Sequence, residues 1–301
     1  MTVERAKTPR VIVGLALLLA AGAARAQALT FVPVTSIYED DKKVPLRGPE
    51  GVACTSAGIV VADTGNGRLL NLAYKDGGLS GGTEMKVSQL PYPTRVQSDS
   101  KGSLLVLDRK TRRIVRLDRG GTFVGFLDLK GPSSLGVVVP GSFQLDSADN
   151  VYVLDLATLS VLVADPAGNV TRQVPLPRQG MFTDVAVDAG GTIYVSDGPG
   201  AAIWSADRTA TSFKPLAKDL KDAMSFPGHI VAVRGRLFVS DQNGHGIVLL
   251  GLDGSYQGRQ LGIGAAEGFL SYPSQVCVND KNEAFVADRG NNRVQVFAVS
   301  Q

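Results

Sequence analysis

Asp184 and His229 are the residues in this chain best suited to proton transfer, because a carboxylate can orient a histidine that acts as a base. Each follows by two residues the residue that introduces an apolar strand. The equivalent positions in the six copies of this pattern are Gly51, Arg95, Ser142, Asp184, His229 and Gln275. A purely structural position would tend towards one residue type. Five different polar residues therefore predict a ligand-binding or partner-binding site around one mouth of a channel.

The ring of residues does not contain a complete catalytic set. No nucleophile is expected beside Asp184 and His229, and the chain has only one other histidine, His245, in a turn where we expect it at the surface. Three further polar residues could extend the ring, namely Glu50, Gln97 and Gln144. The alternative to a binding site is that these groups satisfy one another's hydrogen bonds and hold water in the channel.

The elements that would position this ring come from an internal repeat. Six apolar runs each end in an aspartate, and these aspartates are 42 to 47 residues apart. They are Asp63, Asp108, Asp155, Asp197, Asp241 and Asp288. Each copy contains an inner strand, the apolar run, a turn, a third strand and usually a weaker fourth strand. An all-strand repeat of this length predicts a six-bladed, all-β propeller with four-stranded blades.

The last copy ends after three strands. Residues Thr30 to Tyr38 form an apolar strand that belongs to no copy, so we expect this N-terminal strand to complete the last blade and close the ring.

The six repeated aspartates have two interpretations. They could form a ring of carboxylates around metal, or each could accept backbone N–H groups in its own turn. We expect the second role. In three copies an arginine follows five residues later, which predicts the pairs Asp63–Arg68, Asp108–Arg113 and Asp288–Arg293.

Three segments resemble NHL repeats: Pro49 to Ala53, Val61 to Arg68 and Val286 to Phe297. The resemblance implies a six-bladed propeller, a fold that hosts scaffolds, ligand binders and some enzymes. Related amidating lyases use several channel histidines, which this chain lacks. Sugar lactonases hold a divalent ion with one Glu, two Asn or similar, and one Asp. Here Glu50 and Asp184 could contribute to such a site, but the ring has no asparagine.

Cys54 and Cys277 are the only cysteines, and both lie in inner strands, of the first and last blades. These blades are neighbours in a closed ring, so a disulfide would lock the closure and stabilise it by about 4–5 kcal/mol in the chain-entropy model. Packed sheets lie about 10 Å apart, which is too far unless the blades converge near the axis. Two buried free thiols are the alternative.

Residues 1–28 are predicted to be a cleaved signal peptide, with basic residues, an apolar run from Val11 to Ala24, and Ala26-Gln27-Ala28 at its end. Without this segment the chain has 27 basic and 27 acidic side chains. This balance argues against nucleic acid as a partner. We expect a periplasmic or secreted protein with no membrane anchor after cleavage.

The sequence therefore predicts one domain over residues 29–301 after the signal peptide. Its expected function is to bind or scaffold a protein partner or small polar ligand at the channel mouth, through Arg95, Ser142, Asp184, His229 and Gln275, with no cofactor. The alternative is a lactonase-like hydrolase or lyase with one divalent ion near Glu50 and Asp184. An electron-transfer role finds no cofactor motif, although an accessory subunit of such a system stays open.

Overall fold

The computed structural model describes residues 29–55, 58–75, 77–131, 135–217 and 220–300. The predicted signal peptide, residues 1–28, lies outside the described residues. Within the described ranges, none of the helices has the length and apolar character needed to cross a membrane.

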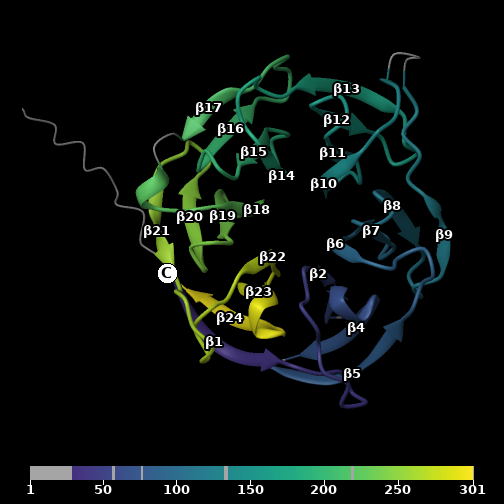
Figure 1. Ribbon diagram of the computed structural model, residues 1–301, viewed down its shortest axis with the longest axis vertical. Helices are drawn as coiled ribbons and strands as arrows, with labels where there is room; N and C mark the ends of the chain where they lie inside the picture. Colours follow the sequence, from purple (N-terminus) through teal and green to yellow (C-terminus); the bar gives the residue numbers. More distant parts are fainter. Residues whose placement is uncertain (1–28, 56–57, 76, 132–134, 218–219, 301) are drawn as a thin grey trace, which may run out of the picture.

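The described strands form six antiparallel four-stranded sheets arranged as blades around a central axis (Figure 1), as predicted. The first two blades are β2 (Gly51–Thr55), β3 (Gly58–Asp63), β4 (Arg68–Lys75) and β5 (Gly78–Met85), then β6 (Pro93–Ser98), β7 (Leu104–Asp108), β8 (Arg113–Leu117) and β9 (Phe123–Phe126). The next two are β10 (Pro140–Leu145), β11 (Val151–Asp155), β12 (Ser160–Ala164) and β13 (Val170–Pro175), then β14 (Phe182–Val187), β15 (Ile193–Asp197), β16 (Ala202–Ala206) and β17 (Lys214–Ala217). The last two are β18 (Pro227–Val233), β19 (Arg236–Asp241), β20 (Gly246–Gly251) and β21 (Tyr256–Gln260), then β22 (Pro273–Val278), β23 (Glu283–Asp288), β24 (Arg293–Ser300) and β1 (Thr30–Ile37). Short 3-10 turns occur at η1 (Thr64–Asn66), η3 (Leu220–Asp222) and η4 (Arg289–Asn291).

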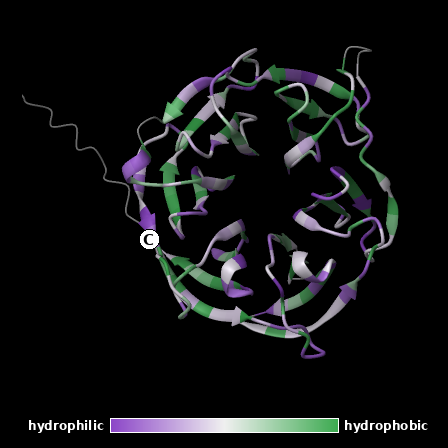
Figure 2. Ribbon diagram, in the orientation of Figure 1, coloured by the Kyte–Doolittle hydropathy of each residue, from purple (hydrophilic) through white to green (hydrophobic). Residues whose placement is uncertain are grey.

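The hydrophobic core lies between the blades. The second strand of each blade is covered on both faces by neighbouring sheets, so its sequence is continuously apolar instead of alternating; all five residues of β7 and of β11 are buried. Figure 2 shows the apolar segments concentrated in the middle of the blades. One cluster joins Val52 and Val61 of the first blade to Phe285 and Val296 of the last. The packing of neighbouring blades on one another positions the inner strands around the axis.

The N-terminal strand completes the last blade, as predicted. β1 pairs antiparallel with β24, from Thr30 opposite Ser300 to Ile37 opposite Val294. Just beyond β1, the Tyr38 hydroxyl accepts a hydrogen bond from Nη1 of the buried Arg293 at 2.8 Å. The two ends of the described chain therefore belong to one sheet. β1 supplies the fourth strand that the last copy lacks and covers the edge of β24.

Cys54 of β2 and Cys277 of β22 form a disulfide, with their Cα atoms 5.8 Å apart. Both residues lie in innermost strands, where the blades converge towards the axis (Figure 1). This convergence brings the first and last blades within reach of a disulfide, although sheets further out are too widely spaced.

The six repeated aspartates stabilise loops. Each accepts a backbone N–H from the segment that precedes the inner strand of its own blade, for example Arg47 N to Asp63 and Val139 N to Asp155, both at 2.7 Å. The same contact recurs in the other four blades. In every blade, the aspartate at the end of the second strand thus fixes the loop that leads into the inner strand.

Two of the three predicted aspartate–arginine pairs are confirmed. Arg68 pairs with Asp63 at 2.8 Å, and Arg293 pairs with Asp288 at 2.7 Å. The prediction for Arg113 was wrong, because its guanidinium lies over the Phe126 ring and pairs with Asp128 at 3.3 Å. The carboxylate of Asp108 instead accepts N–H groups of its own turn and of the segment before β6.

Candidate functional site

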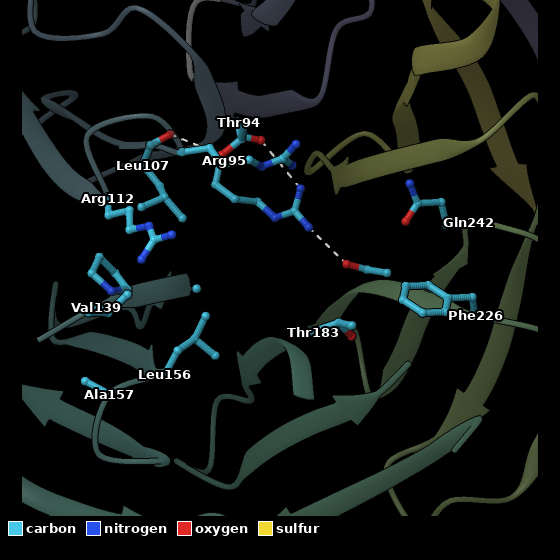
Figure 3. Close-up of a pocket in the computed structure, with 14 residues that line it drawn as sticks. Thr94, Arg95, Leu107, Arg112, Val139, Leu156, Ala157, Thr183, Phe226 and Gln242 are labelled. Atoms are coloured by element: carbon cyan, nitrogen blue, oxygen red, sulfur yellow. Dashed lines mark hydrogen bonds between the residues drawn. The ribbon is translucent and has the colours of Figure 1, made fainter. Parts of the chain in front are cut away.

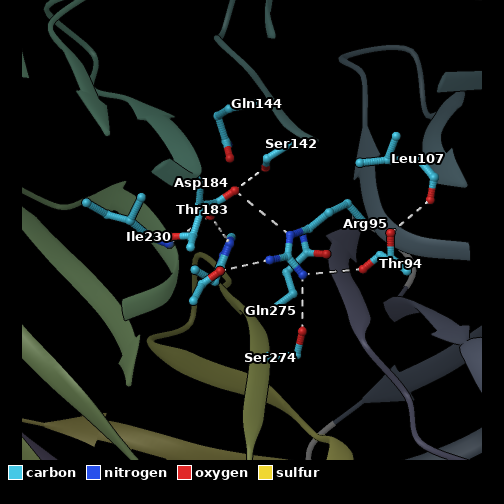
Figure 4. Close-up of polar contacts among 12 residues, drawn as sticks. Thr94, Arg95, Leu107, Ser142, Gln144, Thr183, Asp184, Ile230, Ser274 and Gln275 are labelled. Atoms are coloured by element: carbon cyan, nitrogen blue, oxygen red, sulfur yellow. Dashed lines mark hydrogen bonds and ion pairs between the residues drawn. The ribbon is translucent and has the colours of Figure 1, made fainter. Parts of the chain in front are cut away.

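The six predicted ring positions lie at the starts of the inner strands β2, β6, β10, β14, β18 and β22. In every blade except the first, the pairing of the inner strand with its neighbour shifts near this position, as between Pro93 and Arg95 or between Phe182 and Asp184. Such irregularities bend a strand and re-aim its side chains. The ring side chains consequently meet one another near the axis (Figure 4).

Asp184 is the centre of a buried polar network. Its Oδ1 accepts the Ser142 hydroxyl from the preceding blade. Its Oδ2 accepts the backbone N–H of Ile230 at 2.8 Å and lies 2.5 Å from Nδ1 of His229, both in the next blade. Arg95, from the blade two places earlier in the ring, brings its Nε to 3.9 Å from Oδ1. One carboxylate therefore ties four blades together.

Both ring nitrogens of His229 face oxygen atoms. Nδ1 faces Asp184, and Nε2 lies 3.2 Å from the backbone carbonyl oxygen of Val276. Because a carbonyl oxygen only accepts, Nε2 carries a proton when it bonds to Val276. The Val276 carbonyl and the Asp184 carboxylate thus face both ring nitrogens, so His229 has no free nitrogen with which to accept a substrate proton.

Burial by itself would raise the pKa of Asp184. The opposing charge and contact of His229, followed by Arg95 and Ser142, outweigh burial and hold the pKa of this carboxyl below its usual value. Asp184 is therefore an anion at neutral pH although it is fully buried, because its neighbours supply the charge and the donors that water would otherwise supply.

Arg95 spans the channel above this network. Its Nη2 donates to the Gly228 carbonyl at 2.9 Å, and its Nη1 donates to the Ser274 hydroxyl at 3.1 Å. These contacts join the second blade to the fifth and sixth blades across the axis (Figure 4). The side chain of Arg95 remains 12% exposed, whereas those of Asp184 and His229 are 1% and 3% exposed.

The side chain of Gln275 also connects two blades that are not adjacent, the sixth and the second. Its amide nitrogen donates to the Val96 carbonyl at 2.9 Å, and its amide oxygen accepts the Val96 N–H at 3.2 Å. The intervening blade presents only Gly51 at this level. A Cβ on Gly51 would lie 3.3 Å from the Gln275 amide oxygen and 2.9 Å from the Ala62 Cβ. The glycine therefore leaves the space through which Gln275 reaches its partner.

The other candidate residues lie apart from Asp184. Gln97 and Gln144 bond to each other at 3.1 Å. Glu50 binds the guanidinium of Arg109, with contacts of 2.5 and 3.3 Å. His245 is half-buried, and its Nδ1 accepts the backbone N–H of Tyr272 at 3.1 Å.

The predicted metal donors do not form a metal site. Both oxygens of Asp184 are already bound by groups of the protein, and Glu50 is held by Arg109. Among the described residues, no group of three His, Cys, Asp or Glu side chains is close enough to share an ion. The cation that faces Asp184 in the channel is the guanidinium of Arg95, so the donor chemistry here does not fit a divalent ion.

A cavity of about 560 Å³ lies at the channel mouth (Figure 3). Of the predicted ring residues only Arg95 lines it, since Ser142, Asp184, His229 and Gln275 are buried. The other lining residues come mainly from loops and strand ends of the second to fifth blades, and include Arg109, Arg112, Val139, Leu156, Phe226 and Gln242.

Sequence reasoning missed most of this lining. One sequence signal could have revealed part of the lining. In every copy except the first, an apolar residue directly precedes the proline or phenylalanine at which the inner strand begins. These residues are Tyr92, Val139, Met181, Phe226 and Tyr272. Val139 and Phe226 line the cavity, while Tyr92, Met181 and Tyr272 are exposed.

Comparisons with known proteins agree with this fold. The model of the NHL repeat matches residues 270–297, which contain β22, β23 and the first part of β24. The chain is a six-bladed β-propeller whose last blade matches the NHL repeat. No match to this propeller was found among curated protein sequences.

Solved structures share the architecture at low sequence identity. A gluconolactonase from Xanthomonas campestris is 16% identical, with 93% of each chain covered and a TM-score of 0.68. Virginiamycin B lyase from Staphylococcus aureus is 13% identical, with 90% of this chain and 98% of that chain covered and a TM-score of 0.61. A chain of a nidogen–laminin complex is 15% identical, with 75% and 89% covered and a TM-score of 0.56. At these identities the likeness shows the fold alone.

Proposed function

We propose that this propeller is a binding module that holds a small ligand, or a side chain of a protein partner, in the cavity at the channel mouth. The observation that carries the proposal is the saturation of Asp184 by Ser142, Ile230 and His229. The residues best suited to catalysis bind one another and connect the blades, while the cavity is lined by arginines, by apolar side chains, and by Thr94, Thr183 and Gln242.

Three exposed apolar residues lie directly before inner strands, at the end of the propeller where the cavity opens, and they support binding at this face. Tyr92, Met181 and Tyr272 are 37%, 71% and 48% exposed, and they occupy the same repeat position in three blades. Large apolar side chains gathered on one face of a soluble protein commonly mark an interaction site. Arg109 lies 5.6 Å from the centre of the Tyr92 ring, which continues this surface towards the cavity.

A metal-dependent hydrolase or lyase is the second candidate. The direct contact between Asp184 and His229 favours it, as does the shared architecture with proteins described as a gluconolactonase and a lyase. The donor set argues against it, because Asp184 and Glu50 already hold protein cations.

Chelation distinguishes these two candidates. We expect the purified protein to keep its melting temperature within about 1 °C after treatment with EDTA, because the carboxylates that could hold an ion, Asp184 and Glu50, already face protein cations. Metal content is measured in parallel by mass spectrometry. A stoichiometric divalent ion whose removal lowers the melting temperature would overturn the binding-module proposal, since an ion bound at a hundredfold excess over its dissociation constant contributes about 2.7 kcal/mol.

We also propose that the protein functions in the periplasm or outside the cell. The pairing of Cys54 with Cys277 supports this location, because disulfides persist mainly in oxidising compartments. The expected result is an exported protein that begins at Leu29 and contains no free thiol. The intact mass of the exported protein, before and after alkylation under denaturing conditions, checks both points; retention of residues 1–28 would contradict the predicted cleavage.

A further inference from the structure

The cavity at the channel mouth has an unbalanced charge. Three of its lining residues are arginines, Arg95, Arg109 and Arg112, and none of its lining residues is acidic. Arg109 is neutralised by its two contacts with Glu50. Arg112 is exposed, and none of the described residues forms a hydrogen bond or ion pair with it. The cavity therefore contains one guanidinium whose charge the protein does not compensate.

Arg95 adds to the positive potential of the cavity. Its ion-pair partner is Asp184, whose Oδ1 lies 3.9 Å from Nε of Arg95 and whose Oδ2 contacts His229. The side chain of Asp184 is 1% exposed and does not line the cavity, whereas Arg95 does. An anion in the cavity would therefore meet the guanidinium of Arg95 with no carboxylate beside it in the lining.

Arg95 also retains hydrogen-bonding capacity. A guanidinium has five N–H donors. The bonds of Arg95 within the described structure use Nη1 for Thr94 and Ser274, and Nη2 once for Gly228. Its Nε is buried without a hydrogen bond. The second N–H of Nη2 is therefore available to an acceptor in the cavity, which Arg95 lines.

Part of the cavity wall is apolar, although Thr94, Thr183 and Gln242 also line it. Val139 and Leu156 lie on the side of Arg112, and Phe226 lies on the opposite side of Arg95 (Figure 3). Leu156 is 45% exposed. A ligand whose body covers Leu156 and Phe226 would remove apolar surface from water, which favours binding. The cavity volume of about 560 Å³ falls within the range of small-molecule sites.

From this combination we infer that the cavity binds a small amphiphilic organic anion. Its carboxylate lies between Arg112 and the free N–H of Arg95, and its apolar body extends over Leu156 towards Phe226. This inference rests on the proposed binding function and specifies its ligand class. A purely polar sugar would leave the apolar wall exposed, and a cation would meet arginines without a free acidic partner.

The inference can be tested with 4-phenylbutyrate as the probe, using calorimetry or ligand-observed NMR. Two matched compounds separate its parts: 4-phenylbutanamide has the same body without the charge, and acetate has the charge without the body. We expect 4-phenylbutyrate to bind at least tenfold more tightly than either compound, because charge-assisted hydrogen bonds and apolar burial contribute together. Its affinity should fall as salt is raised, since Arg112 is exposed.

The chain provides a matched pair of variants. Arg112→Gln should weaken binding of 4-phenylbutyrate about tenfold and leave binding of the amide unchanged. Arg113→Gln removes the same charge from the adjacent residue, whose side chain is turned to Phe126 and Asp128 and does not line this cavity. This control should bind the probe like the wild type. The melting temperature of both variants shows whether they are folded.

The outcomes separate the inference from the function on which it depends. Equal binding of 4-phenylbutyrate and its amide, unaffected by Arg112→Gln, would overturn the anion inference and leave the cavity as a binding site. Equal weakening by Arg112→Gln and Arg113→Gln would also overturn it, because the effect would then come from overall charge. No binding of any probe at millimolar concentration would remove support from both the inference and the proposed binding of small ligands.

Discussion

Replacing both cysteines, Cys54→Ala together with Cys277→Ala, is expected to lower the free energy of unfolding by about 3–5 kcal/mol. The two residues are separated by 223 positions and connect the first blade to the last. Removing so long a covalent loop gives the unfolded chain many more conformations, which stabilises the unfolded state. Equilibrium unfolding in guanidinium chloride, followed by intrinsic fluorescence, measures the difference.

The reductant provides the control. Dithiothreitol should lower the midpoint of the wild-type transition towards that of the double variant, and it should leave the double variant unchanged. The ring would still be closed by the pairing of β1 with β24. A loss below about 1 kcal/mol would mean that this pairing alone closes the ring and that the disulfide adds little.

The second large effect is expected for Asp184→Asn, which should cost about 3–5 kcal/mol of stability, as does breaking a buried ion pair. An asparagine cannot neutralise the guanidinium of Arg95, which is mostly withdrawn from water, and it loses the carboxylate contact with the buried His229. Its amide NH₂ would also face donors, either the Ile230 N–H or the Ser142 hydroxyl. Chemical unfolding of the variant and the wild type measures the cost.

Asp118→Asn is the matched control. Asp118 is exposed, and its Oδ1 accepts the N–H groups of Gly120 and Thr122, a role that an asparagine can also perform. We expect this change to cost less than about 0.5 kcal/mol. A similar small cost for Asp184→Asn would mean that the network around Asp184 does not hold the blades together.

The cost of Asp184→Asn should depend on pH. The pKa of Asp184 is lowered in the folded state from its ordinary value of 3.8, so ionised Asp184 stabilises the fold above that value. This contribution is lost as the pH falls through the folded-state pKa. The difference in stability between wild type and variant should therefore be constant near neutral pH and shrink below pH 3.8. A difference that grows on acidification would contradict the assignment.

The repeated elements of the fold could be predicted from the sequence, because they depend on local patterns. The regular return of an apolar run and an aspartate predicted six blades, and the unpaired segment from Thr30 to Tyr38 predicted how the ring closes. The pairs Asp63–Arg68 and Asp288–Arg293 were also accessible, since their partners lie five residues apart across one turn. Arg113 departs from this pattern because its side chain contacts Phe126, in the next strand, and Asp128, just beyond that strand.

The candidate site was only partly predictable. Residue type and repeat position marked Arg95, Asp184 and His229, but not their roles. The contact between Arg95 and Gly228 joins residues 133 positions apart, in the second and fifth blades, and the repeat does not indicate that blades three copies apart make contact across the axis. Only the tertiary structure shows that Arg95 covers the carboxylate and faces the cavity.

The sequence was therefore sufficient to predict the strands, the number of blades and the residues that surround the axis. Only the tertiary structure shows which of these residues bind one another in the interior and which line the cavity. The physical reason is that strand periodicity is set by neighbouring residues, whereas side-chain contacts at the axis depend on how blades from distant parts of the chain converge. Arg112 and Leu156 line one cavity only through that convergence.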